Sequence, residues 1–84
     1  MNSVLTWSQP RDLTVYNLAL VPQAGGVYLL IRGGAVIYVG RTSDLRERLT
    51  THLNGSHNTC VAGHVRLGGV TFQYAMVAWE GDRL

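Results

Sequence analysis

The sequence has no lysine, a single cysteine, and charged residues at only 14% of its 84 positions. One cysteine, Cys60, cannot form an internal disulfide. This excludes a small secreted domain stapled by disulfides and fits a reducing, cytoplasmic setting. The low charge, beside 46% hydrophobic residues, excludes an ordinary disordered tail.

Long apolar runs are also missing. Stretches such as 27–31, 35–39 and 75–79 fall far short of the roughly 20 residues that span a bilayer. The first ten residues have neither the cationic start nor the apolar run of a signal peptide. We therefore expect a cytoplasmic protein with no membrane segment.

The cations are all arginine, seven in number, and the formal net charge is +2. The planar fork of an arginine matches phosphate in a bidentate way, which favours a phosphate-rich partner. A charge of +2 is too small to identify nucleic-acid binding, and a GC-rich coding bias would also produce a chain without lysine. The length predicts one domain, residues 1–84, with a small core.

Two apolar segments joined by two glycines form the clearest pattern. Residues 26–32 and 35–40 are rich in strand-forming side chains, and Gly33-Gly34 lies between them. A tight hairpin turn needs positive φ at both central residues, so this pattern predicts a β-hairpin. Because both segments are nearly continuous apolar runs, we expect the hairpin to be covered on both faces.

A helix is predicted after the hairpin. Thr42 or Ser43 can cap it, and Asn54-Gly55 can end it. Leucines at positions 45, 49 and 53 form one apolar stripe. Arg48 and His52 are four residues apart, so they share a helix face at the edge of that stripe.

The remaining segments complete an α+β prediction. Residues 56–64 fit either a loop or a short helix, residues 70–79 fit a third strand, and residues 81–84 fit the opening of a helix. The expected fold is a small, mainly antiparallel sheet of three strands, hairpin first, flanked by helices, with the C-terminal helix cut short.

Two tripeptides carry a family resemblance. Gly26-Val27-Tyr28 and Tyr38-Val39-Gly40 place two tyrosines ten residues apart, and Arg41, Arg48 and His52 follow. This spacing resembles the GIY-YIG nuclease superfamily. The match is good over residues 25–53, and the strand at 70–79 fits the third strand of that family.

The resemblance implies hydrolysis of DNA phosphodiester bonds with Mg²⁺ or another divalent metal. It implies that Tyr38 activates the attacking water, alone or with His52, and that Tyr28 orients water or phosphate. Arg48 would bind the scissile phosphate. Since an ordinary tyrosine is only about one part in a thousand ionised at pH 7, Tyr38 would need a nearby cation, for which Arg41 is the candidate.

The metal ligand is the weak point of the resemblance. The family places a glutamate on a helix after the third strand, and the sequence ends at Leu84, where that helix would begin. Glu80, or Asp82, is the candidate substitute ligand. Otherwise the carboxylate is missing, and we expect these 84 residues to cleave little DNA and to self-associate through an uncovered sheet face.

Other functions remain open. The same scaffold could serve as a non-catalytic nucleic-acid-binding or protein-interaction domain. His57, Cys60 and His64 could in principle hold zinc, although their spacing is not that of a standard zinc finger. The simpler interpretation of these three residues is a polar loop with one free thiol.

Overall fold

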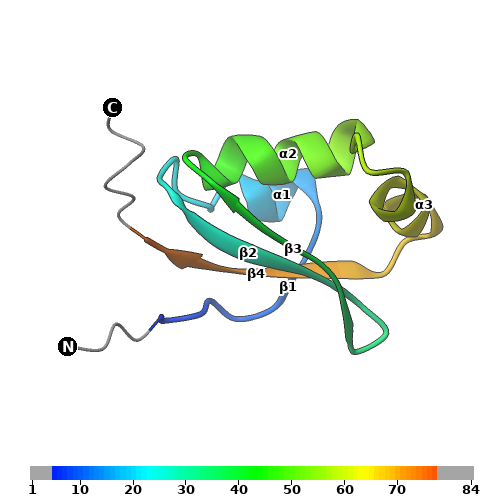
Figure 1. Ribbon diagram of the computed structural model, residues 1–84, viewed down its shortest axis with the longest axis horizontal. Helices are drawn as coiled ribbons and strands as arrows, with labels where there is room; N and C mark the ends of the chain where they lie inside the picture. Colours follow the sequence, from blue (N-terminus) through cyan, green and yellow to red (C-terminus); the bar gives the residue numbers. More distant parts are fainter. Residues whose placement is uncertain (1–4, 78–84) are drawn as a thin grey trace.

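One antiparallel sheet carries the fold in the computed structural model, which describes residues 5–77 (Figure 1). In chain order the elements are β1 (Arg11–Asp12), α1 (Val15–Leu18), β2 (Gly26–Arg32), β3 (Ala35–Thr42), α2 (Leu45–Gly55), α3 (Thr59–Leu67) and β4 (Val70–Met76). The strands lie in the order β1-β4-β2-β3, and each neighbouring pair is antiparallel. The α+β prediction is confirmed, but the sheet has four strands rather than three. The two-residue β1 is too short to leave a periodic pattern in the sequence.

The hairpin forms where the glycine pair predicts it. Gly33 and Gly34 have φ values of 62° and 78°, which suit glycine at both central positions of a tight turn. The pairing of β2 with β3 shifts between Leu30 and Ile31, so β3 carries one extra residue there. On the side of the bulge away from the turn, Tyr28 pairs with Gly40 and Leu30 pairs with Tyr38. Tyr28 and Leu30 are two residues apart on one strand, so they share a face, and directly paired residues share a face as well. Tyr28 and Tyr38 therefore point to the same side of the sheet.

Helix α2 begins one residue later than the predicted caps allow. Its N-cap is Asp44, whose carboxylate accepts a hydrogen bond of 3.0 Å from the Glu47 amide. Thr42 instead accepts the Asp44 amide with its hydroxyl at 3.1 Å, which turns the chain into the helix. The prediction of Thr42 or Ser43 as the cap was wrong because three adjacent residues can all cap, and side-chain type does not choose among them.

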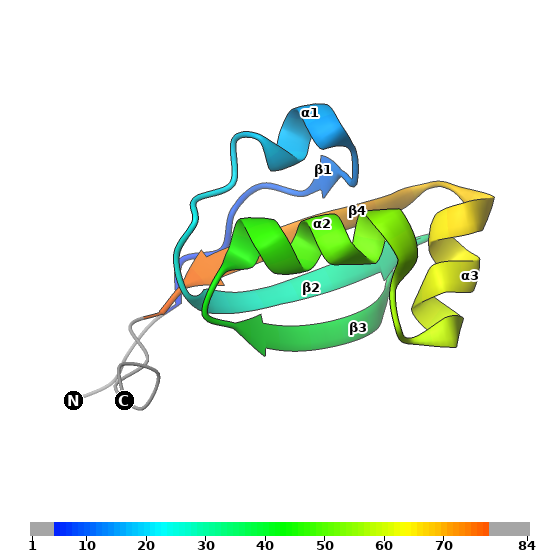
Figure 2. The same ribbon diagram turned by 90° about the horizontal axis from the view of Figure 1, so that it is seen from above.

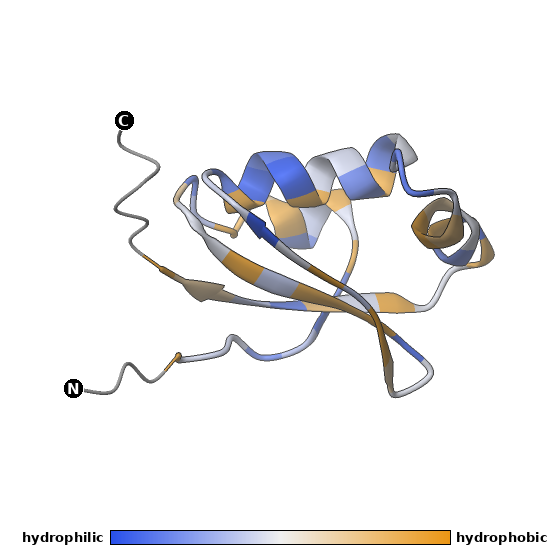
Figure 3. Cartoon of the chain, viewed as in Figure 1, coloured by the Kyte–Doolittle hydropathy of each residue, from blue (hydrophilic) through white to orange (hydrophobic). Residues whose placement is uncertain are grey.

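The core lies between the sheet and α2, which crosses over β2 (Figure 2). Leu45 and Leu49 of α2 are completely buried against the helix-facing side of the sheet, as are Leu30 and Phe72. The side of α2 that faces away from the sheet is largely polar (Figure 3). The predicted leucine stripe is therefore the buried side of the helix.

Among residues 5–77 no helix covers the opposite face of the sheet (Figure 1). β3 is an edge strand, and Val36 and Val39 are 52% and 63% exposed. The expectation that the hairpin is covered on both faces is therefore wrong for β3, since an apolar run does not distinguish an edge strand from a central one. Near the N-terminus, the chain runs beside β4, where the Ser8 amide donates to the Tyr74 carbonyl at 2.8 Å.

The structure decides between the loop and the helix that were both possible for residues 56–64, and it defines the strand predicted at 70–79. Most of 56–64 belongs to α3, capped by Asn58, whose side chain accepts from the Val61 amide at 3.1 Å. The third predicted strand is β4, which ends at Met76. Residues 78–84, with the predicted ligands Glu80 and Asp82 and the predicted helix opening, lie outside the described residues. Within residues 5–77 no helix has the length and apolar content needed to cross a bilayer.

Candidate active site

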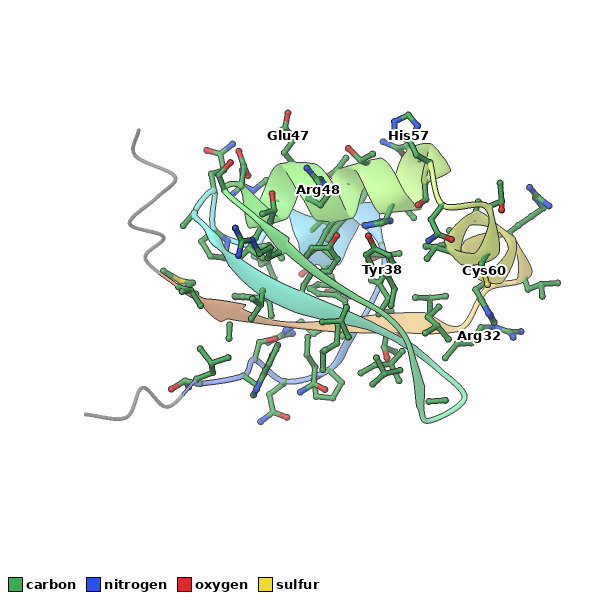
Figure 4. All side chains as sticks on the ribbon, viewed as in Figure 1. Arg32, Tyr38, Glu47, Arg48, His57 and Cys60 are labelled. Carbon is green, nitrogen blue, oxygen red and sulfur yellow. The ribbon has the colours of Figure 1, made fainter. Side chains whose placement is uncertain are left out.

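A hollow of about 410 Å³ opens between α2 and the edge strand β3. Figure 4 shows Tyr38 and Arg48, which line it from the two elements. Tyr38 from β3 lines one side. The other lining residues come from α2 and from the segment that links it to α3: Glu47, Arg48, Thr51, His52, Ser56, His57 and Asn58. The arrangement follows from the fold, because β3 leads directly into α2 and the helix then runs back alongside that strand (Figure 2).

His52 lines this hollow, and Tyr28 lies buried behind it. Tyr28 is 0% exposed and His52 is 5% exposed, and a hydrogen bond of 2.8 Å joins the Tyr28 hydroxyl to Nε2 of His52. The Tyr28 ring fits against Gly40, where a Cβ atom would overlap the ring and its hydroxyl. The glycine of the second tripeptide therefore makes room for the tyrosine of the first.

The three rings of this site contact one another. Ring centroids are 6.1 Å apart for Tyr28 and Tyr38, 5.5 Å for Tyr28 and His52, and 5.1 Å for Tyr38 and His52. The last pair is edge-to-face. Arg48, one turn before His52 on α2, interacts electrostatically with Tyr28 and His52. The structure thus brings together four of the five predicted catalytic residues.

Burial and charge set the protonation states of Tyr28 and His52. Burial raises the pKa of Tyr28, the neighbouring Tyr38 raises it further, and the Arg48 charge and hydrogen bond partly oppose this. Burial lowers the pKa of His52, and the Arg48 charge lowers it further. At neutral pH the Tyr28 phenol therefore keeps its proton and the imidazole is uncharged.

The second nitrogen of His52 has a partner that the sequence analysis did not find. Nδ1 lies 2.9 Å from the hydroxyl of Ser56, which also accepts the Asn58 amide at 3.2 Å. Ser56 follows directly after α2, and Asn58 caps α3. The only sequence signal is the position of Ser56 four residues after His52, one helical turn along the chain.

Arg41 is the predicted site residue that the structure does not bring into the hollow. It follows Gly40, which faces Tyr28, so the alternation of β3 directs Arg41 to the other side of the sheet. Its side chain is exposed, and it is not among the residues that line the hollow. Within the hollow the cation is Arg48.

Glu47 supplies a carboxylate at the rim of the hollow. Its side chain is exposed and extends away from the sheet (Figure 4). Mg²⁺ is bound through one or two carboxylates, with waters and substrate phosphates completing its shell. Across residues 5–77 no three His, Cys, Asp or Glu side chains gather closely enough to hold one metal ion. This holds for the possible zinc ligands His57, Cys60 and His64 as well.

Fold and site together define a catalytic domain of the GIY-YIG type. A model of the GIY-YIG catalytic domain matches residues 24–82. The match covers well over half of the sequence and includes the whole hollow. The chain belongs to the GIY-YIG catalytic domain family, as the two tripeptides predict.

Relatives of known name agree with this assignment. The chain is 41% identical over 50 residues to the UvrABC system protein C of Streptococcus uberis and 37% identical over 50 residues to that of Streptococcus mutans. In both cases the match covers 58% of this chain and 8% of the relative, so the chain corresponds to a small part of those proteins.

Solved structures show the same fold. The GIY-YIG N-terminal endonuclease domain of UvrC from Thermotoga maritima, bound to its catalytic divalent cation, superposes with a TM-score of 0.61 at 24% identity. The superposition covers 80% of this chain and 72% of that one. A second structure of that domain matches with the same TM-score at 22% identity.

Proposed function

We propose that this domain hydrolyses phosphodiester bonds of DNA with the help of a divalent cation. The observation that carries the proposal is the convergence of a phenol, a guanidinium and an imidazole on one hollow, with the phenol of Tyr28 hydrogen-bonded to the imidazole from behind, within a fold whose relatives include an endonuclease domain. Direct attack by water on the phosphate is the reaction that the family resemblance implies for these groups.

Each group has a role that its position allows. Tyr38 lines the hollow and takes the proton from the attacking water, as the family resemblance implies. Arg48 forks onto the phosphate and offsets the charge that builds in the transition state. Tyr28 and His52, hydrogen-bonded beneath, hold the Tyr38 ring in place through their ring contacts. Arg41 would act from the strand outside the hollow by attracting the DNA backbone.

The cation is proposed to be held by Glu80, within the segment that the family model matches. Mg²⁺ would supply Lewis-acid stabilisation of the phosphoryl oxygens. Glu47 is the carboxylate that the described residues add at the rim.

Nicking of supercoiled plasmid DNA with and without Mg²⁺ tests the proposal. The protein is used in excess over DNA, because we expect cleavage to be slow. Tyr38→Phe and Arg48→Ala should each reduce nicking by roughly 100-fold or more. Arg11→Ala is the matched control. It removes the same charge from β1, at the opposite edge of the sheet from β3. Nicking that persists in both site variants, or that needs no cation, refutes the proposal.

A second function is favoured by one observation, the lack of a metal-holding cluster among residues 5–77. In that case the domain binds DNA phosphates through Arg48 without cutting. Gel-shift binding that Arg48→Ala weakens, together with no nicking at any Mg²⁺ concentration, would establish the binding function and exclude the nuclease.

A further inference from the structure

Ser56 is the outermost member of a hydrogen-bonded chain whose middle members, Tyr28 and His52, are buried. The Tyr28 hydroxyl interacts with Arg48 and lies 2.8 Å from Nε2 of His52, and Nδ1 of His52 lies 2.9 Å from the Ser56 hydroxyl. The Ser56 oxygen also accepts the Asn58 amide. Three of these groups can donate or accept, so the direction of the chain depends on its ends.

The ends fix one direction. A guanidinium only donates, so any hydrogen bond between Arg48 and Tyr28 has the Tyr28 oxygen as its acceptor. The Tyr28 hydrogen must then find an acceptor, because a buried hydroxyl hydrogen without one is costly. Nε2 of His52 is the acceptor beside it, and it can accept only if the proton of the neutral imidazole is on Nδ1. The opposite direction would leave the Tyr28 hydrogen unpaired in a side chain that is 0% exposed.

The Ser56 end agrees with this direction. When Nδ1–H donates to Ser56, the serine oxygen accepts two hydrogen bonds, one from His52 and one from the Asn58 amide. Its own hydrogen is then left to point toward the hollow that Ser56 lines. Each buried donor of Tyr28 and His52 then has an acceptor.

We infer that Ser56 is a positioning residue that accepts the Nδ1–H of His52 and, together with the Tyr28 hydroxyl at Nε2, holds the imidazole in the Nδ1–H tautomer. The tautomer assignment stands on the hydrogen-bond geometry alone. Its consequence for cleavage rests on the proposed function. With His52 and Tyr28 fixed, the Tyr38 ring that contacts both is held in one place.

Nitrogen-15 NMR of the imidazole in the full chain tests the tautomer directly, since protonated and unprotonated ring nitrogens resonate far apart. The wild-type protein should show a protonated Nδ1 and an unprotonated Nε2. Ser56→Ala should convert this to a mixture of the two tautomers, and Ser56→Thr, which keeps the hydroxyl, should restore the wild-type pattern. Tyr28→Phe should also shift the wild-type pattern toward a mixture, because Nε2 then no longer has to accept the Tyr28 hydrogen.

Thr51→Ala is the matched control. Thr51 lines the same hollow, but its hydroxyl donates to the Glu47 carbonyl at 3.1 Å and not to His52. This variant should keep the wild-type tautomer. A wild-type spectrum with the proton on Nε2 overturns the inference even if Ser56→Ala fails to fold. So does an unchanged tautomer in a folded Ser56→Ala protein.

Cleavage provides a separate readout. If the domain nicks DNA, Ser56→Ala should reduce the rate by roughly tenfold, as for other partners that orient a functional histidine, and Ser56→Thr should recover it. An Nδ1–H tautomer in a protein that never nicks DNA would refute the proposed function while supporting the role of Ser56.

Discussion

Replacing Gly40 by alanine should damage both the stability and the site of this domain. Gly40 does not have a positive φ, so its backbone does not require glycine. The space does: a methyl group there would overlap Cζ, Cε1 and Oη of Tyr28. Because Tyr28 is completely buried, the ring cannot move aside into solvent.

The cost has two parts. Overpacking a core position costs about 1–3 kcal/mol. Moving the phenol away from His52 also breaks a buried hydrogen bond, which costs about 1–3 kcal/mol. The sum, about 2–6 kcal/mol, is a large part of the roughly 4–13 kcal/mol expected for 84 residues at the usual stability per residue. Gly40→Ala should therefore be partly unfolded or close to it.

Urea unfolding followed by circular dichroism measures the loss, and Gly63→Ala is the control. Gly63 lies within α3, and a Cβ there meets nothing within 4 Å. Alanine at 63 should leave stability unchanged or raise it by up to about 1 kcal/mol through helix propensity. If Gly40→Ala unfolds at the same urea concentration as the wild type, the close packing of Tyr28 on Gly40 is not what this position provides.

Three further predictions concern α2 and the buried pair of Tyr28 and His52. Folding lowers the pKa of His52 below its ordinary value near 6.5. As the pH drops from 7 toward 5, the unfolded chain therefore binds more protons than the folded one, and the stability of the fold should decrease. His52→Gln should flatten that slope in urea titrations, and an equally steep slope would contradict the cause. Tyr28→Phe keeps the ring but leaves Nε2 of His52 without its donor, so it should cost about 1–3 kcal/mol in the same titrations; no loss would show that water replaces the hydroxyl. Asp44→Ala should cost about 1 kcal/mol as the lost cap of α2, whereas Ser43→Ala should be neutral by thermal denaturation; equal losses would return the cap to Ser43.

Local sequence patterns predicted the parts of this fold that local interactions determine. The glycine pair at 33–34 indicated the hairpin because few other residues adopt positive φ twice in succession. The stripe of leucines indicated which side of α2 is buried. The convergence of Tyr28, Tyr38, Arg48 and His52 was anticipated from their spacing, since a hairpin followed at once by a helix leaves little freedom for where these groups lie.

What escaped prediction depends on tertiary contacts. β1 consists of two residues, and only its pairing with β4 makes it a strand. Ser56 is one of many polar residues in its segment, and its bond to His52 arises from the path between the two helices. Arg41 points to the opposite side of the sheet because side chains alternate along a strand. The residue order shows this only once Gly40 is known to face Tyr28.

Among the four described strands, the one synthesised last, β4, lies in the middle of the sheet. β4 pairs with β1 on one side and with β2 on the other, so neither neighbour has a partner there until residues 70–76 leave the ribosomal exit tunnel. Up to that moment the nascent hairpin presents a bare β2 edge, to which another chain could add a strand. A ribosome stalled before Val70 would therefore hold a nascent chain that already contains Tyr28 and His52, yet is open to mispairing along its whole β2 edge.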